Sequence, residues 1–336
     1  FGGAIEKVIL AVGEGAEADW WERFRDRLGG LNTEIRIEPS FSYLSEQKGS
    51  PANISARIRK ALTQLFAGAT ASDDVVWTHN VGIGRNLLLA RELFKFCAPR
   101  RIRIVTHHHD WWFENRWARW LEMRRCGFPT LAAIAKTIFA PQANVRHAGI
   151  NQADAAMLRR FFSLRAGWLP NLTERKSTPP IRRVRTARAW LKAKCEIGTA
   201  PLWIVPCRLL RRKNIAEALL LTRWLRPEAW LITTGGASSA DELDYARRLE
   251  QAARRHEWRL SLGILHGRDP RKPGVAELLA ASEAVLLTSL QEGFGLPYLE
   301  ASAAGRPLIA RALPNIAPDL AQFGFGFPQN YDEILI

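Results

Sequence analysis

The sequence predicts an α/β protein made of two Rossmann-like, doubly wound domains that face one another across a cleft. Three observations support this prediction. Apolar runs of strand length alternate with segments of helical periodicity in both halves of the chain. A polar, proline-containing stretch, residues 169–180, interrupts that alternation near the middle. The length of 336 residues suits two domains of ordinary size.

The first half is expected to alternate strands with helices. The predicted strands are 7–12, 34–38, 74–79 and 101–106, and the predicted helices are 18–28, 54–66 and 86–96. Residues 34–38 alternate charged and apolar side chains with a period of two, as a half-buried strand does. Alternating strands and helices form a parallel sheet, which binds its ligands beyond the carboxyl ends of the strands.

The second half repeats this architecture. The predicted strands are 202–205, 229–233, 262–265, 284–288 and 308–310, and the predicted helices are 215–225, 241–256, 274–281 and 297–304. We therefore expect a first domain over residues 1–170, a linker with an entry helix over 171–200, and a second domain over 201–336.

Composition limits the class of protein. The hydrophobic content of 47% is enough for two cores, and the longest apolar runs are far shorter than a membrane span. The four cysteines are scattered, which argues against a structural zinc site and against a disulfide framework and favours a reducing cytoplasm. The net charge of +15 fits nucleic acid, an anionic membrane, a phosphorylated ligand, or arginine-rich composition alone. No nucleic-acid-binding motif is visible, so no such partner is expected.

The most informative segment is Glu292–Glu300, which reads EGFGLPYLE. An apolar run precedes it and a helical segment begins within it, so the order is strand, glycine turn, helix. Such a turn directs backbone N–H groups and the positive end of a helix at an anion, most often a phosphate. A carboxylate at Glu300 can accept both hydrogen bonds of a ribose diol. The alternative is a surface turn with two exposed acids.

This segment resembles the donor-binding motif of the retaining glycosyltransferases of the GT-B fold known as family GT4. The family signature is Glu, seven residues, Glu, with a Gly-Phe-Gly turn after the first Glu. The resemblance implies that Glu292 binds hydroxyls of a donor sugar and that Glu300 holds the ribose. It implies that backbone groups of the turn bind sugar and phosphate oxygens, at Gly293, Phe294, Gly295 and Leu296.

A second element, residues 208–214, resembles the Gly-Arg-x-x-x-x-Lys-Gly element of the same family. Arg208 and Lys213 match by position and would stabilise the leaving diphosphate, where charge develops in the transition state. Cys207 and Asn214 replace the two glycines. A solvated basic turn is the alternative interpretation. Gly235, at the end of a further predicted strand, is a weaker candidate for contact with the donor.

A third candidate is the run His107-His108-His109-Asp110 at the carboxyl end of a predicted strand. GT4 proteins often have a histidine there that faces the donor sugar, and we align His109 with it. His108 is the next choice, although alternation along a strand would place the two on opposite sides. Three histidines also suit a metal, but we expect none, because adjacent ligands on one strand cannot all converge.

Two neighbouring segments complete the candidate site. His79 and Asn80 begin a glycine turn between a strand and a helix, which we interpret as an acceptor-side loop together with His108 and Asp110. The aromatic segment 111–120 suits stacking on sugars or a membrane interface, and core packing of a helix is the equal alternative.

These observations predict a retaining hexosyltransferase with an acceptor-side domain followed by a nucleotide-sugar-binding domain. The expected donor is a UDP-, GDP- or ADP-linked sugar, and the expected acceptor is a glycan, a lipid-linked glycan or another hydroxyl. Retention without an enzymic nucleophile implies front-face attack. No cofactor or metal is expected, and a cytoplasmic location on the inner membrane leaflet would suit the basic charge.

Two alternatives stay open. One is a sugar-nucleotide epimerase on the same fold. The other is a fragment that binds a nucleotide sugar without turnover, because by comparison with the GT4 pattern we expect one element to be missing at the start and one or more at the end.

Overall fold

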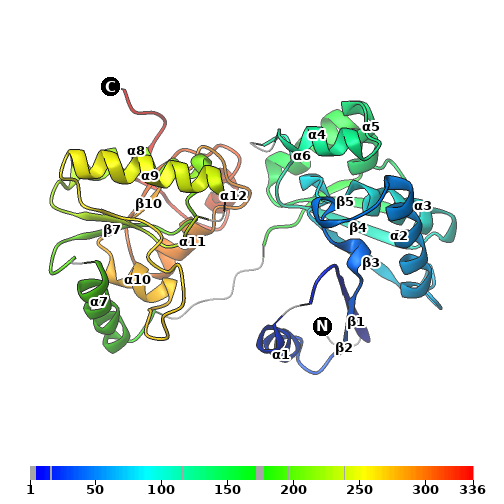
Figure 1. Ribbon diagram of the computed structural model, residues 1–336, viewed down its shortest axis with the longest axis horizontal. Coiled ribbons are helices and arrows are strands. Elements are labelled where there is room, and N and C mark those ends of the chain that lie inside the picture. Colours follow the sequence, from blue (N-terminus) through cyan, green and yellow to red (C-terminus); the bar gives the residue numbers. More distant parts are fainter. Residues whose placement is uncertain are drawn as a thin grey trace. The chain divides into compact units, whose positions relative to one another are not determined.

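The computed structural model describes residues 5–15, 17–114, 117–171, 178–195, 197–237 and 239–335. The chain divides into two compact units, 1–169 and 170–336 (Figure 1). Both units are built on parallel sheets flanked by helices, so each is a Rossmann-like α/β unit.

Unit 1 contains two parallel sheets. The smaller sheet pairs β1 (Lys7–Val12) with β2 (Asn32–Ile37), which α1 (Ala18–Arg27) connects. The larger sheet has the order β3 (Val75–His79), β4 (Arg103–His108), β5 (Val145–Gly149), β6 (Ala166–Trp168). The remaining helices are α2 (Pro51–Leu65), α3 (Leu87–Arg100), α4 (Arg119–Arg125), α5 (Leu131–Ile138) and α6 (Gln152–Phe162).

Local sequence explains where the two longest helices of unit 1 begin. The side chain of Ser50 accepts a hydrogen bond from the N–H of Asn53 at the start of α2, and Asn86 does the same for Leu89 at the start of α3. Both helices contribute apolar side chains to one core, with Ile58 and Leu87 fully buried. This core fixes the larger sheet and thereby the ends of β3 and β4.

Unit 2 contains one six-stranded parallel sheet. Its order is β12 (Asn330–Tyr331), β11 (Leu308–Arg311), β10 (Ala284–Leu287), β7 (Leu202–Val205), β8 (Trp230–Thr233), β9 (Leu260–Ser261). The helices are α7 (Ile181–Cys195), α8 (Ile215–Leu225), α9 (Ala240–Arg255), α10 (Val275–Ala281), α11 (Leu296–Ala303) and α12 (Ala317–Ala321).

The two faces of this sheet bury separate apolar clusters. Along β7, Leu202 and Ile204 pack into one cluster, whereas Trp203 and Val205 pack into the other. Side chains of a strand alternate between the faces, so a strand covered on both sides is apolar throughout. Helices α8 and α9 cover one face, and α7 and α10 lie on the other (Figure 1).

Each predicted helix and strand except one overlaps an element of the structure, although several bounds differ by a few residues. β4 extends to His108, so two of the three consecutive histidines belong to the strand. The predicted strand 262–265 is wrong, because β9 ends at Ser261. Gly263 adopts a positive φ of 61°, which an extended strand does not allow. Residues 172–177, which are part of the predicted linker, lie outside the described residues.

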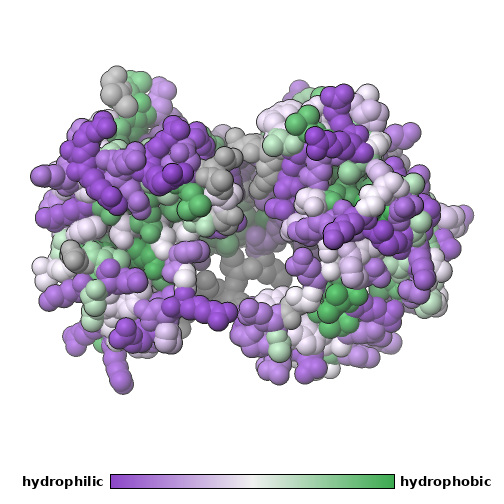
Figure 2. Space-filling view, viewed as in Figure 1, coloured by the Kyte–Doolittle hydropathy of each residue, from purple (hydrophilic) through white to green (hydrophobic). Residues whose placement is uncertain are grey.

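Hydrophilic side chains cover most of the face drawn in Figure 2, with smaller apolar areas among them. Within the described part of the chain, none of the helices has the length and apolar character needed to cross a membrane.

Candidate active site

The candidate site of unit 2 forms where neighbouring parallel strands end. β7 pairs with β10 on one side and with β8 on the other, so the loops that follow them share one edge of the sheet. These loops carry Arg208 and Lys213 after β7, Gly235 after β8, and Glu292 after β10. The topology thus explains why residues far apart in sequence meet.

Lys213 and Glu292 form the centre of this edge. The Lys213 ammonium donates a hydrogen bond to Oε1 of Glu292, and Arg212 Nη1 lies 3.6 Å from Oε2. The Ser289 hydroxyl donates to Oε1 at 2.6 Å. The side chains of Lys213 and Glu292 are only 13% and 9% exposed. A buried carboxylate is tolerated when cations and hydrogen bonds compensate for lost hydration, as they do here.

Hydrogen bonds to backbone carbonyls hold the two loops together. The Thr288 hydroxyl donates to the carbonyl of Lys213 at 2.9 Å, and the N–H of Leu290 donates to the carbonyl of Arg212 at 2.8 Å. Arg212 Nη1 donates to the carbonyl of Gln291 at 2.9 Å. The pair Lys213–Glu292 is therefore fixed by its supporting loops as well as by its own charges.

The glycine turn leads directly into α11. Gly295, at the N-cap, has a φ of 75°, and a Cβ there would lie 2.8 Å from the Tyr298 ring. Both facts require glycine. Pro297 has no N–H and the N–H of Tyr298 donates to the carbonyl of Gly295 at 3.0 Å, so the N–H of Leu296 is the donor that the first turn of α11 offers to an anion. Burial, together with the charge of Glu292, raises the pKa of Tyr298 to about 12.

The other predicted donor residues lie around this centre. Arg208 is half exposed, and its Nη2 lies 3.1 Å from Oε1 of Glu242 in α9. Gly235 packs on Arg208, because a Cβ there would come within 2.9 Å of the arginine Cγ. Glu300 lies half-buried in the second turn of α11. Gly293 and Phe294 occupy the turn between Glu292 and that helix, and Leu296 is the first residue of the helix.

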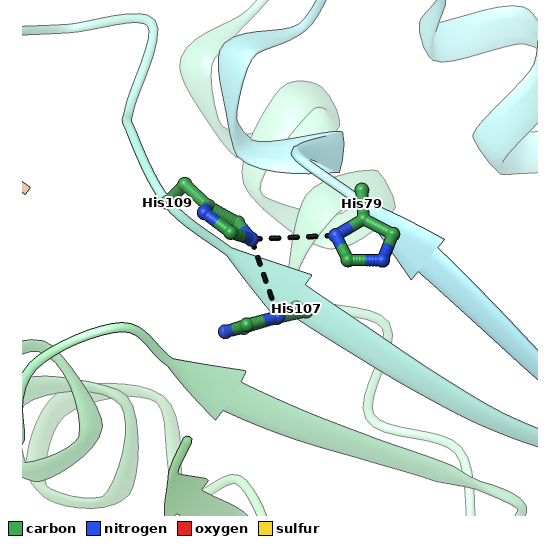
Figure 3. Close-up of side chains that lie close together, drawn as sticks. All are labelled: His79, His107 and His109. Atoms are coloured by element: carbon green, nitrogen blue, oxygen red, sulfur yellow. Dashed lines mark hydrogen bonds between the residues drawn. The ribbon is translucent and has the colours of Figure 1, made fainter. Parts of the chain in front are cut away.

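Unit 1 brings three histidines together at the ends of β3 and β4 (Figure 3). His79 is the register partner of His107, and His109 follows two residues later on the same side. Nε2 of His109 lies 3.2 Å from Nδ1 of His107 and 3.3 Å from Nδ1 of His79. Asn80 orders the loop, because its side-chain oxygen accepts hydrogen bonds from the N–H groups of His109 and Asp110.

Partial burial lowers the pKa of all three rings. The pKa of His109 falls to about 4, first through desolvation and then through the charges of His107 and His79. The pKa values of His79 and His107 also lie below the ordinary value, mainly through desolvation. The cluster is therefore neutral near pH 7 and presents ring nitrogens rather than positive charge.

His108 occupies the opposite face of β4. It is fully buried, and its Nε2 lies 3.0 Å from Nδ1 of His147. Its ring stacks on Trp111 at 4.7 Å between centroids. The side chain thus packs in the interior and has no exposed surface for a ligand, so we drop His108 from the acceptor-side residues.

The aromatic segment divides between core and surface. Trp111 and Trp112 are buried, whereas Trp117 is 58% exposed. The turn that contains Gly82 packs on these tryptophans, since a Cβ at Gly82 would lie 2.7 Å from the Trp111 ring. Core packing therefore explains the start of this segment and the glycine. Asn115 and Arg116, which the sequence placed in the same segment, lie outside the described residues.

Sequence reasoning missed three contributors to these sites. Arg212 and Ser289 both contact Glu292, but the two motifs recognised in the sequence assign no role to either residue. His79 was assigned to the acceptor side, but its convergence with His107 was not foreseen. The strand positions of residues 79 and 107 were the available signal, because both stand at carboxyl ends of predicted strands.

A comparison with protein families identifies the second unit. Residues 190–327 match the family model of the glycosyl transferases group 1. Over this segment, unit 2 is similar to the GT4 glycosyltransferases. The match covers η4 (Arg211–Lys213), the glycine turn and α11, which together form the site of unit 2.

Two curated proteins of Petrotoga mobilis are similar to this chain. The mannosylglucosyl-3-phosphoglycerate synthase is 26% identical over 247 residues, which are 71% of this chain and 46% of the relative. The mannosylglucosylglycerate synthase is 21% identical over 281 residues, covering 75% of this chain and 62% of the relative. The chain thus spans about half the length of these relatives.

Solved structures show that the fold is GT-B. HepE of Anabaena, in complex with UDP and glucose, has a TM-score of 0.60 and 15% identity, covering 93% of this chain and 74% of HepE. The sucrose-phosphate synthase of Thermosynechococcus elongatus has a TM-score of 0.61 and 16% identity, covering 92% of this chain and 82% of the synthase.

Proposed function

We propose that the protein transfers a sugar, with retention, from a nucleotide-sugar donor to a hydroxyl acceptor. The observation that carries the proposal is the meeting of Lys213 and Glu292 beside the start of α11. It joins a cation, a carboxylate and the positive end of a helix. A nucleotide sugar needs all three, since it combines a diphosphate with sugar and ribose hydroxyls.

Each residue has a distinct role in this proposal. Lys213 has three N–H donors, and its bond to Glu292 uses one of them, so the others can bind the diphosphate. Arg208 has a long, flexible side chain that is half exposed, and it binds the same phosphates. Charge grows on the leaving phosphate in the transition state, where both cations stabilise it. Glu292 and the backbone from Gly293 to Leu296 hold the sugar.

The remaining assignments of the proposal concern the ribose, the acceptor and the domains. Glu300 accepts hydrogen bonds from the ribose, and Gly235 allows close approach of the donor. His109, with His79, Asn80 and Asp110, belongs to the acceptor-side domain, residues 1–170. Residues 171–200 connect it to the donor-binding domain, residues 201–336. Attack from the front face needs no enzymic nucleophile.

The relatives narrow the sugar chemistry that should be tested first. Both curated relatives carry names of synthases that build mannosyl and glucosyl glycosides, and HepE was solved with UDP and glucose. UDP-, GDP- and ADP-linked glucose and mannose are therefore the first donors to test. The acceptor in this proposal is a glycan or a lipid-linked glycan, and the net charge of +15 suits an enzyme that works at an anionic inner leaflet.

Calorimetry with UDP, GDP, ADP and their glucose and mannose conjugates tests the donor site. One nucleotide should bind in the micromolar range, and Glu300→Gln should weaken it about ten-fold through loss of a charged ribose contact. Glu250→Gln, on the exposed surface of α9, is the matched control and should change nothing. Absence of binding by every nucleotide would overturn the proposal.

Product analysis then separates transfer from its alternatives. Transfer yields free nucleoside diphosphate in step with a glycosylated acceptor, with the anomeric configuration of the donor. An epimerase changes the sugar without any acceptor. A fragment that only binds the donor releases no nucleotide even when acceptors are supplied.

A further inference from the structure

We propose that His79, His107 and His109 form a binding site for a divalent transition-metal ion, with Zn²⁺ as the fitting ion. One ring nitrogen from each histidine belongs to a group whose ligand atoms all lie within 4.8 Å of one another. Figure 3 shows the three rings turned toward a common region at the ends of β3 and β4. The inference concerns unit 1 and does not depend on the donor site.

The spacing of these nitrogens matches tetrahedral zinc. Two nitrogens bound to one zinc ion at about 2.05 Å lie about 3.3 Å apart. Nε2 of His109 is 3.2 Å from Nδ1 of His107 and 3.3 Å from Nδ1 of His79. Two of the three nitrogen pairs thus already have the required separation, and only His79 and His107 need to approach.

The hydrogen bonding of His107 prepares it as a ligand. Its Nε2 lies 2.7 Å from the carbonyl oxygen of Leu169, and a carbonyl only accepts, so Nε2 carries the proton. Its Nδ1, which faces the cluster, therefore has its lone pair available. Metal-bound histidines in proteins commonly donate their other N–H to a backbone carbonyl in this way.

The backbone fixes the ligands before any ion binds. His79 and His107 are register partners in adjacent parallel strands, and the Asn80 side chain holds the N–H of His109 at 2.9 Å. The adjacent residue His108 points to the opposite face. Three consecutive histidines cannot converge, as the sequence predicted, but two of them with His79 do.

The character of the cluster favours a transition metal over Mg²⁺ or Ca²⁺. Its ligand atoms are imidazole nitrogens, which suit Zn²⁺, Ni²⁺ and Cu²⁺, whereas Mg²⁺ and Ca²⁺ require oxygen. His79 is exposed and His107 is buried, so one side of the cluster reaches solvent. Three protein ligands leave a fourth position for water or another ligand.

An ion in this position would compete with the role proposed for His109. Nε2 of His109 lies nearest to both other ligand nitrogens. The same lone pair cannot bind an ion and accept a hydrogen bond from a sugar hydroxyl. Metal binding and sugar contact at His109 are therefore mutually exclusive.

Direct metal titration of the full chain tests the proposal. Protein stripped with a chelator is titrated with Zn²⁺ by calorimetry and with Co²⁺ by visible absorption, which reports tetrahedral coordination. One equivalent should bind, and His79→Gln and His109→Gln should each weaken binding at least ten-fold, by analogy with losses measured for residues that only support ligands. Mg²⁺ should not bind to the cluster.

The chain offers a matched control in His256, an exposed histidine of unit 2. His256→Gln should leave both titrations unchanged. Wild-type protein that binds no Zn²⁺, or that retains its affinity in both cluster variants, would overturn the proposal. Nucleotide binding is measured separately, so failure of the metal site leaves the donor site untouched, and the reverse also holds.

Discussion

The two units carry polar clusters of opposite character at the ends of their parallel strands. In unit 2, Glu292 is buried between Lys213 and Arg212. In unit 1, the cluster found among the described residues consists of three histidine rings, and desolvation lowers their pKa values and so keeps the rings neutral. The first cluster is charged and compensated, whereas the second consists of neutral rings that are hydrogen-bonded to one another.

This difference follows from the same topology. Parallel strands end at a common edge, where side chains are freed from the sheet and meet across strands. Which chemistry results depends on the few residues placed there. The unit 2 cluster suits a ligand with both an anion and hydroxyl groups, and the unit 1 cluster suits a cation. The predictions that follow test whether the clusters are independent.

Lys213→Met should produce the largest effect. The change leaves Glu292 buried with one weaker cation, and breaking a buried pair costs about 3 kcal/mol or more in free energy of unfolding. Transfer should fall by on the order of 100-fold, as for other electrostatic stabilisers. Urea denaturation and initial rates measure the two effects.

The double variant Lys213→Met/Glu292→Gln tests the origin of that loss. If the uncompensated carboxylate is the cause, neutralising it should restore stability but not transfer. The loss of unfolding free energy in the double variant will then be smaller than the sum of the losses in the two single variants. Additive losses of stability would show that the two side chains contribute independently.

Arg311→Met should reduce stability without affecting the donor site. Arg311 forms two hydrogen bonds with Glu217, at 3.1 and 2.6 Å, and the tyrosine of β12 donates to the same carboxylate. Both side chains of the pair are largely buried, so the loss should be about 2 kcal/mol in free energy of unfolding. Calorimetry should give an unchanged nucleotide affinity. A large loss of affinity would mean that the donor site depends on the whole of unit 2.

Unit 1 should lose stability in acid. Burial lowers the pKa of His147 and lowers that of His108 far below the ordinary value. Below about pH 6.5 the unfolded chain binds protons at these rings and the folded chain does not, so stability falls as pH falls, by at most about 1.4 kcal/mol per pH unit for each ring. Hydrogen exchange of β4 and β5, measured with a chelator present at pH 7 and pH 5, reports the change. Equal protection at both values would contradict the burial argument.

Sequence reasoning predicted the architecture and named candidate residues at the edge of the unit 2 sheet, but not all their contacts. The apolar run of β7 and the EGFGLPYLE turn are local signals, so the sheet and the turn could be predicted. The pairing of Lys213 with Glu292 and the roles of Arg212 and Ser289 depend on loops from separate strands. The histidine cluster depends on the register of β3 and β4, which no single segment specifies.

Two buried cysteines can report on the units separately, and this is the smallest effect that we predict. Burial raises the pKa of Cys97 to about 11 and that of Cys207 to about 12. At pH 8 only about one Cys207 thiol in 10⁴ is a thiolate, so alkylation should require opening of unit 2. Lys213→Met should accelerate labelling of Cys207 and leave the labelling rate of Cys97 unchanged. Mild acid should instead destabilise unit 1 and leave unit 2 unaffected. Mass spectrometry of labelled peptides measures both rates. Parallel acceleration of the two cysteines would show that the units open together, and the contrast between their clusters would then not extend to their stability.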